Sequence, residues 1–417
     1  MSSSCHNGAR RRGRRGIALG GAACVVVSVG QPALALEYFV PRVEATGEYD
    51  SNINMDPTNT KAYGYGGLAM ADIGWITQTS DTAIRPYFNY MRYPDQQGIY
   101  ELDSRVDLRW LFNTQRSQFS LYGRFDREDT TYAELSSALY NPLDPNVRPN
   151  ADTGYVQEGV IRTLGYAAPS WSYRMTQRLS FTTDLYYLHE SYNDTGSTAV
   201  ENALNGFNYY SATVSLQQRL TETSTLKYGG YFARFDSGGV ARTNGYGLKV
   251  EYNRKWTQRL SLLLSGNAER DKTDETYPVV FNGSTTQWGA AAGLVYQGEI
   301  STTRLTVDRI LSPSGAGAMI ASNEMWLQYD RRWTERLKFI GALRYIHDGA
   351  VGESANLFPV RNYTRAYVEA RYMVTPTWYF RVDYEYTWQG FHGEPSAANN
   401  GVSIGFGYQA LKPPGVP

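Results

Sequence analysis

The chain alternates apolar and polar residues in short runs, and residues 246–270 show the pattern most clearly. Leu248 and Val250 flank the polar Lys249, and the same alternation continues on both sides. A strand places successive side chains on opposite faces, so this alternation predicts one apolar and one polar face. Residues 256–259 interrupt the alternation, and it resumes after them. The segment is therefore predicted to be a β-hairpin with a tight turn.

The same turn recurs along the chain. Residues 175–179, 256–260 and 333–337 read MTQRL, WTQRL and WTERL, and weaker copies begin at Asn113, Leu220 and Val374. The copies stand mostly 36 to 45 residues apart or near twice that, as a repeated two-stranded unit would. The predicted strands are 38–50, 62–76, 83–93, 103–113, 117–127, 158–174, 178–190, 207–220, 224–236, 243–256, 259–270, 285–298, 302–311, 322–333, 336–347, 362–374, 377–389 and 400–408.

The residue types on the two faces of these strands predict which face meets lipid and which lines the interior. In 378–388, Trp378 and Val382 belong to an apolar face, and Arg381 and Asp383 to a polar one. A charged side chain facing lipid at midplane costs roughly 2–4 kcal/mol, so the apolar face must meet lipid and the polar face must line a wet interior. No helical pattern is available to cover the apolar face. We therefore expect an all-β fold, a transmembrane antiparallel β-barrel of about 18 strands in the outer membrane of a Gram-negative bacterium.

Other architectures and strand counts fit less well. A barrel of sixteen or twenty strands is possible, because alternation is weak in the second and thirteenth strands. An eight-stranded calyx or a soluble sandwich would leave most of the hairpins unaccounted for. An even strand number places both termini on the periplasmic side, with the short turns.

The polar faces supply the candidate lumen residues. Both signs of charge occur among them, so we expect mixed networks and weak ion selectivity. The predicted lumen-lining residues are Arg105, Asp107, Arg109, Arg124, Asp126, Lys249, Glu251, Arg344, Glu369, Arg371, Arg381, Asp383 and Glu385.

The first 35 residues predict an export signal. Five arginines between Arg10 and Arg15 precede an apolar stretch from Ile17 to Val29, and Ala33-Leu34-Ala35 gives a small-x-small cleavage site. The stretch is shorter than the roughly 20 apolar residues that a membrane helix needs. The predicted organisation is a signal peptide over 1–35, a barrel over 36–408 and a periplasmic tail over 409–417.

Removal of the signal changes the charge and the cysteine count. Both cysteines, Cys5 and Cys24, lie in it, so the mature chain needs no disulfide chemistry. The loss of five arginines leaves 35 basic against 40 acidic residues, and this acidic balance argues against a nucleic-acid partner.

The longest connection runs from Glu128 to Gln157 and is the third on the extracellular side. Loops of this length in a compact domain tend to be functional or disordered. In porins the third loop characteristically folds into the lumen, so we expect a constriction here. A surface lid or a mobile loop is the alternative. Its acidic residues are expected to pair with luminal Arg105, Arg109 or Arg124. The constriction-loop candidates are Glu128, Asp129, Glu134, Asp144, Arg148 and Asp152.

Aromatic residues and the last strand support a membrane location. Aromatic girdles mark the two interfaces of such barrels. Asn399-x-Gly401-x-x-Ile404-x-Phe406 resembles the terminal signature that barrel insertion machinery recognises. The predicted girdles contain Trp75, Trp171, Trp256, Trp333 and Trp378 beside the short turns, and Tyr49, Tyr93, Tyr192, Tyr345 and Trp388 near the opposite ends.

Catalysis finds little support in the mature chain. Its histidines are His189, His347 and His392, each at or beyond the outer end of a strand. His347 and Asp348 are adjacent in a strand and point to opposite faces, so they are poorly placed to pair. No metal-ligand cluster or nucleotide fingerprint occurs. We expect neither an enzyme nor a cofactor.

A family resemblance adds a functional expectation. Residues 48–54, the repeated Trp-Thr-Gln/Glu-Arg-Leu turns and Pro169-Ser-Trp-Ser-Tyr resemble the outer-membrane barrels encoded with bacterial exopolysaccharide systems. The resemblance covers nearly the whole mature chain and implies export of a surface polysaccharide, with periplasmic export components as partners beside lipid, lipopolysaccharide and the insertion machinery.

A diffusion porin for small solutes is the alternative function, and a structural or adhesive barrel is a third. A polymer conduit should have a wide lumen that is polar along its length. A diffusion porin should be narrowed by an inward loop.

Overall fold

The computed structural model describes residues 35–96, 100–139, 153–157, 159–194, 204–275, 281–351 and 360–413. The predicted signal, apart from Ala35, lies outside these residues, and so do Asp144, Arg148 and Asp152. Within the described ranges, no helix is long and apolar enough to cross a membrane.

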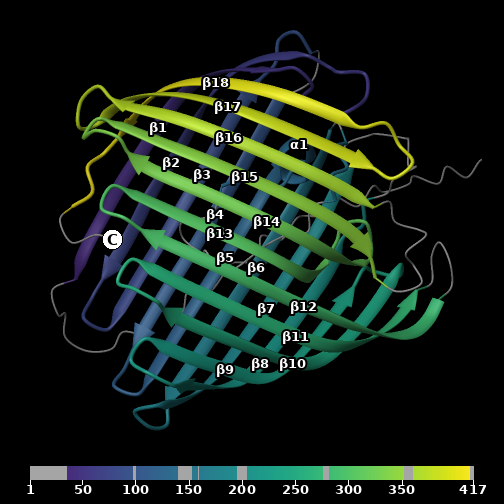
Figure 1. Cartoon of the computed structure of the whole chain (residues 1–417). Helices are drawn as coiled ribbons and strands as arrows, with labels where there is room; N and C mark the ends of the chain where they lie inside the picture. The colour runs from purple at the N-terminus through teal and green to yellow at the C-terminus, as the bar shows by residue number, and fades with distance from the viewer. Residues whose placement is uncertain are drawn as a thin grey trace, which may run out of the picture. The chain divides into compact units, whose positions relative to one another are not determined.

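Eighteen antiparallel strands form one sheet in which each strand pairs with the next. β1 also pairs with β18, with Arg42 opposite Gln409 and Asp50 opposite Gly401, and this pairing closes the sheet into a barrel (Figure 1). The strands are β1 (Leu36–Asp50), β2 (Ala62–Ile76), β3 (Ser80–Arg92), β4 (Tyr100–Asn113), β5 (Ser117–Asp129), β6 (Val160–Arg174), β7 (Leu179–Asp194), β8 (Phe207–Arg219), β9 (Ser224–Asp236), β10 (Ala241–Lys255), β11 (Leu260–Glu275), β12 (Phe281–Gln297), β13 (Ser301–Pro313), β14 (Met319–Arg332), β15 (Leu337–Ala350), β16 (Arg361–Met373), β17 (Trp378–Phe391) and β18 (Ala397–Gln409).

The predicted barrel is confirmed, and its strand count is eighteen. Most strand ends fall within a few residues of the predicted ones, because the turns set the register. The predicted hairpin at 246–270 is β10 and β11, joined at Trp256–Arg259. One short helix, α1 (Thr130–Ala133), follows β5 and begins the long third loop.

A threonine explains why the turn motif repeats. The Oγ1 of Thr257 accepts hydrogen bonds from the backbone N–H groups of Arg259 and Leu260, at 3.1 and 3.0 Å. Thr176 and Thr334 make the same two bonds in their turns. A threonine hydroxyl that bonds to backbone two and three residues ahead stabilises a tight turn locally. The recurring letters therefore encode a recurring structure.

The outer face is apolar between two aromatic bands. Leu248 is 70% exposed, and Val250 on the same face is 48% exposed. Large apolar side chains so exposed on every side of a closed barrel face hydrocarbon rather than water. The tryptophans predicted beside the short turns are exposed on this outer face: Trp75, Trp171, Trp256, Trp333 and Trp378.

The girdle at the opposite end differs from the prediction in two residues. Tyr345 is exposed on the outer face, as expected. Tyr93 is only 1% exposed and packs with Met91, and Tyr192 hydrogen-bonds to buried carboxylates inside the barrel. Both predictions were wrong because these two tyrosines occupy the inward-facing positions of their strands.

Candidate functional site

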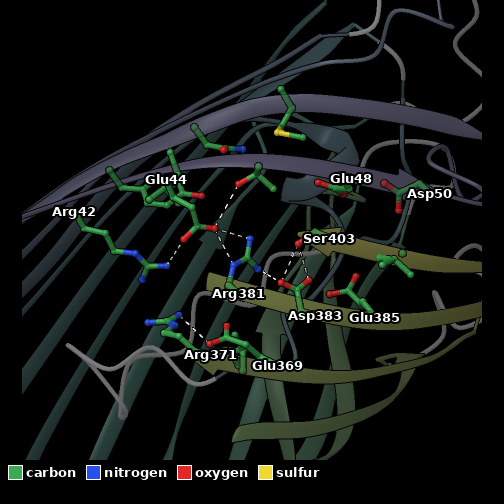
Figure 2. Close-up of a pocket in the computed structure, with 18 of the residues that line it drawn as sticks. Arg42, Glu44, Glu48, Asp50, Glu369, Arg371, Arg381, Asp383, Glu385 and Ser403 are labelled. Carbon is green, nitrogen blue, oxygen red and sulfur yellow. Dashed lines mark hydrogen bonds and ion pairs between the residues drawn. The ribbon is translucent and has the colours of Figure 1, made fainter. Parts of the chain in front are cut away.

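The strand registers define one continuous inner face. Side chains directly opposite each other on neighbouring strands lie on the same face. On β1 the inward residues include Arg42, Glu44 and Glu48, and across β17 and β18 the same face carries Asp383 and Ser403. These residues line a cavity of about 350 Å³ between β1–β3 and β16–β18 (Figure 2). Leu139, from the loop after β5, contributes to its lining.

Ion pairs organise the wall of this cavity. The Glu44 carboxylate forms ion pairs with Arg381 at 2.7 Å and with Arg42 at 2.8 Å, and its side chain is 1% exposed (Figure 2). The Tyr379 hydroxyl also donates to Glu44, at 2.5 Å. Arg381 also forms an ion pair with Asp383, which accepts a hydrogen bond from the Ser403 hydroxyl at 2.8 Å. A buried carboxylate with this many donors is fully compensated, so this wall is rigid and close to neutral.

Other predicted lumen residues enter similar networks. Arg371 pairs with Glu369 at 2.9 Å, and Glu385 pairs with Arg365 at 2.7 Å. On the adjoining strands β3–β5, Asp107 lies between two cations. The described ion pairs there are Arg124–Asp107 at 2.7 Å, Arg105–Asp107 at 3.3 Å and Arg109–Asp81 at 2.8 Å.

Three predicted lumen residues stand apart from these pairs. Asp126 is inward and buried opposite Arg105, with no ion pair among the described residues. Lys249 and Glu251 lie on the inner face of β10, where Lys249 is exposed to water. Neither forms an ion pair within the described ranges.

The loop between β5 and β6, residues 130–159 and hereafter loop 3, crosses the barrel. Its segment 135–138 lies against β14, β15 and β16, halfway round the eighteen strands from β5. Four inward side chains donate to its successive carbonyl oxygens. These bonds are Arg365 Nη1 to Leu135 O at 3.2 Å, Tyr363 Oη to Ser136 O at 2.8 Å, Arg344 Nη1 to Ser137 O at 2.9 Å and Trp326 Nε1 to Ala138 O at 2.6 Å.

We call this binding surface for residues 135–138 the seat of loop 3. It was not predicted from the sequence. Arg344 was expected in the lumen, but Trp326, Tyr363 and Arg365 were not named. Alternate residues of a strand point into the barrel, and all three occupy such inward positions, so the sequence pattern could have identified them. The sequence could not show that a loop following β5 would contact them. Ala138 and Trp326 are 188 residues apart, and no local sequence pattern predicts such a contact.

The returning arm of loop 3 is fixed to the outgoing arm and to the barrel. Thr153 donates to Glu134 through its backbone N–H at 2.6 Å and its hydroxyl at 2.7 Å. The ring of Tyr155 stacks on Phe391, with centroids 4.6 Å apart and planes 5° apart. Burial, with a contribution from the charge of Glu394, raises the pKa of Tyr155 to about 12, so its hydroxyl stays protonated.

The acidic residues predicted for the constriction, at the end of β5 and in loop 3, have partners other than those expected. Glu128 and Glu134 both approach Arg162, each at 3.7 Å. Asp129 accepts from the backbone N–H and the hydroxyl of Thr131, at 3.0 and 2.7 Å. The expected pairing with Arg105, Arg109 or Arg124 was wrong for these three, because those arginines are held by carboxylates on the strands.

A second loop, Ser314–Ala318 between β13 and β14, meets loop 3 at Tyr192. The Tyr192 hydroxyl lies 2.8 Å from Glu134 Oε1 and 2.6 Å from Glu190 Oε1. A phenol has one hydrogen to donate, so the Tyr192 hydroxyl is shared between these two carboxyl groups. A Cβ at Gly315 would lie 2.2 Å from the Tyr192 oxygen, so only glycine permits this approach. Gly315 thus packs against the Tyr192 hydroxyl, which is itself bonded to Glu134 of loop 3.

Charge is distributed unevenly along the inner face. We divide each strand at its midpoint into a half beside the long loops, the extracellular half, and a half beside the short turns, the periplasmic half. Among inward side chains that the structure describes, the extracellular halves carry fifteen carboxylates and six guanidinium groups. The carboxylates are Glu44, Glu48, Asp50, Glu101, Asp103, Asp126, Glu128, Glu190, Glu269, Asp271, Glu275, Asp308, Glu324, Asp348 and Glu385, and the arginines are Arg105, Arg124, Arg162, Arg344, Arg361 and Arg365.

The periplasmic halves have the opposite balance, with thirteen basic and eight acidic inward residues. The basic set is Arg42, Arg85, Arg109, Arg174, Arg219, Lys227, Lys249, Lys255, Arg304, Arg332, Lys338, Arg371 and Arg381, and the acidic set is Asp72, Asp81, Asp107, Asp184, Glu251, Asp330, Glu369 and Asp383. The overall balance of signs that predicted weak selectivity therefore hides two regions of opposite sign.

His189 and His347 lie on the outer face and bond to Asn208 and Asn362 through Nδ1. In the part of the chain that the structure describes, no three His, Asp or Glu side chains gather so as to hold a metal ion.

No protein-family model matches the chain, and no curated protein matches it. Among solved structures, the chain is similar to Pseudomonas aeruginosa OccK2 (OpdF) in complex with glucuronate, at 10% identity, 90% coverage of this chain, 98% of that chain and a TM-score of 0.43. It is also similar to the P. aeruginosa outer membrane protein opdK, at 11% identity, 89% and 99% coverage and a TM-score of 0.42. A third match is the FrpB iron transporter of Neisseria meningitidis, F3-3 variant, at 10% identity, 89% and 81% coverage and a TM-score of 0.42.

Likeness at this level assigns no function. The closed barrel itself, with its apolar outside and charged inside, defines the class: a transmembrane β-barrel of the outer-membrane type.

Proposed function

We propose that the protein is an outer-membrane channel through which small polar solutes diffuse, narrowed by loop 3. The observation that carries this proposal is the seat of residues 135–138 on β14–β16, with four hydrogen bonds from inward side chains to four successive carbonyl oxygens. An eighteen-stranded barrel leaves an aqueous channel unless something fills it. Loop 3 fills one side of it.

The remaining passage follows β10–β12. In the periplasmic halves of these strands the inward residues are small or solvated: Gly293 and Ser265 are partly exposed, and Lys249 and Asn253 are exposed. In the extracellular halves the inward Glu269 and Asp271 are buried. The inward residues beneath loop 3 are also buried. A solute crossing the barrel therefore keeps to the wall formed by β10–β12, which lies four strands round the barrel from the seat.

The charge distribution adds a preference for cations. A solute arriving from outside first meets the extracellular half, where inward carboxylates outnumber arginines fifteen to six. A confined region of one sign raises the local concentration of the opposite ion. Cations and cationic solutes therefore enter more readily than anions.

Passage of a surface polysaccharide is the second candidate, and the sequence resemblance is what favours it. A polymer chain needs a lumen open along its whole length. Loop 3 would have to leave its seat, and the Ser314–Ala318 loop would have to move aside. A small-solute channel needs neither movement, so we prefer it.

Planar-bilayer recording of the purified protein tests both parts of the proposal. We expect discrete conductance steps, and in a KCl gradient a reversal potential of the sign for K⁺ over Cl⁻. Replacing Glu48, Asp50 and Glu385 by Gln should shift the reversal potential towards zero, whereas replacing the turn residue Glu299, exposed outside the lumen, should not. Absence of conductance would support a structural barrel, and preference for Cl⁻ would overturn the charge argument.

A further inference from the structure

The outer face of the barrel carries a group of basic residues at its extracellular edge. Arg234 on β9, Arg242 on β10 and Arg270 with Lys272 on β11 occupy outward positions of three neighbouring strands. All four are exposed. We call these four residues the outer basic patch. It lies outside the lumen and has no part in solute passage.

Two carboxylates, Asp236 and Asp274, share this face, and two of the four cations form no ion pair with the residues that the structure describes. Arg242 pairs with Asp236 at 2.9 Å, and Arg234 lies 3.6 Å from the same carboxylate. Arg270 is opposite Tyr246 and Thr286. Lys272 is opposite Asn244 and Ser284, and neither cation forms an ion pair with any described residue. Two free cations two positions apart on one strand face repel each other, so they favour an anion between them.

The height of the patch in the membrane is fixed by its neighbours. Tyr246, opposite Arg270, is 59% exposed, and Leu248, the next outward residue towards the periplasm, is 70% exposed. Arg270 is thus level with the aromatic band, and Lys272 and Arg234 are one row beyond it. Charged groups immediately outside the apolar band meet the head groups of the outer leaflet.

Cations near the other edge of the outer face are differently occupied. Arg254 on β10 lies over the ring of Trp256 at 5.6 Å, and Arg331 lies over Trp333 at 5.0 Å. A cation over a tryptophan face is already favourably placed. The patch is therefore a local feature of the extracellular edge and not a general property of the rim.

We propose that the outer basic patch binds the phosphate groups of a glycolipid in the outer leaflet, the phosphorylated head of lipopolysaccharide. Its acyl chains would lie on the exposed apolar surface below, around Leu248 and Phe232. Arg270 and Lys272 would supply charge-assisted hydrogen bonds to the phosphate oxygens, as guanidinium and ammonium groups commonly do. Arg234 would approach from the neighbouring strand across Asn244.

The test measures lipopolysaccharide binding to the detergent-purified barrel by native mass spectrometry. Three proteins are compared: the wild type, the double variant Arg270→Gln/Lys272→Gln and the matched control Arg254→Gln. The wild type and the control should retain bound lipopolysaccharide, and the double variant should bind about tenfold more weakly, as loss of charge-assisted contacts predicts. Lipopolysaccharide stripped of its phosphates should bind the wild type as weakly as intact lipopolysaccharide binds the double variant.

Several outcomes would overturn the proposal. Equal binding by the double variant and the Arg254→Gln control would remove the patch from lipid recognition. Equal binding of the dephosphorylated lipid would show that the acyl chains alone are held. A change of oligomeric state in the double variant would assign the patch to a contact between copies of the barrel instead. Conductance in planar bilayers should be unchanged throughout, so this result is separable from the proposed channel function.

Discussion

Two parts of the barrel wall, four strands apart, use the same strand pattern for different purposes. On β14–β16, inward residues such as Trp326, Arg344 and Tyr363 are at most 9% exposed and hold loop 3. On β10–β12, inward Lys249 and Asn253 are exposed, and glycine occupies positions such as 293. Both walls alternate apolar and polar residues. The difference lies in side-chain size and in what a distant loop contributes.

This comparison explains how loop 3 would narrow the proposed channel. Side chains that donate hydrogen bonds face carbonyl oxygens of loop 3, so the loop's backbone groups are satisfied inside the barrel as they would be in a sheet. The wall of β10–β12 offers small side chains in its periplasmic half and, among the described residues, no contact of this kind. In the proposed channel, the cross-section is set by the wall that binds loop 3 and by the wall that leaves the passage open.

Removing loop 3 should abolish the difference between the walls and have the largest effect. Deletion of residues 131–153 exposes Trp326 and Arg344 to water and widens the lumen. We expect single-channel conductance to rise at least about twofold, because the interior of a barrel this size is otherwise open. Heat-modifiable migration on a gel would establish folding. A folded deletion variant with unchanged conductance would locate the constriction elsewhere, for example at the Ser314–Ala318 loop.

The barrel could be predicted from sequence because its determinants are local. Alternation fixes the faces, and turns such as Thr257 to Leu260 fix the register. Tyr93 and Tyr192 were misplaced because their end positions suggested a girdle, although the parity of their strands points them inward. Strand parity is therefore a better guide to the direction of a side chain than its distance from a turn.

The seat of loop 3 could not be predicted in the same way. Its contacts join Ala138 to Trp326 and Ser136 to Tyr363, residues that no local pattern relates. The uneven charge was also missed, although its determinants are in the sequence. When the charges of all inward residues are added together, the excess of one sign in one half offsets the excess of the other sign in the other half. The difference becomes visible only when each strand is divided at its midpoint.

A comparison of two cations should sharpen the difference between the walls next. Arg344 is 3% exposed and bonds to Glu324 at 2.9 and 3.2 Å, so Arg344→Met leaves a buried carboxylate without its main partner. Breaking such a pair costs about 3–5 kcal/mol of unfolding free energy. Lys249→Met, on the solvated wall, should change it by no more than about 0.5 kcal/mol. Urea titration of both variants in detergent measures this, and equal losses would contradict the distinction.

Filling the open wall should produce a smaller effect on passage. Gly293 faces inward, and a Cβ there would lie 3.5 Å from Leu263, an ordinary contact that the fold tolerates. Gly293→Phe should lower single-channel conductance by about a third, because its ring projects into the proposed passage. Gly341 faces outward on β15 with nothing within 4 Å of a Cβ, so Gly341→Phe is the matched control. Similar conductance in the two variants would move the passage away from β10–β12.

The smallest effect is expected from weakening the seat by one hydrogen bond. Trp326→Phe keeps an aromatic ring beneath Arg344, which lies 4.6 Å from the indole ring, but it removes the Nε1 donor to Ala138 O. Losing one such bond costs about 1 kcal/mol, a factor of roughly five in the ratio of seated to unseated loop. Because three donors remain, the loop stays seated most of the time. The expected result is a normal mean conductance with more frequent brief excursions to a larger one. Trp288→Phe, on the outer face, is the matched control and should leave the current trace unchanged if the excursions arise from the lost bond to loop 3. Identical traces for the two tryptophan variants would show that the seat holds loop 3 through its other contacts alone.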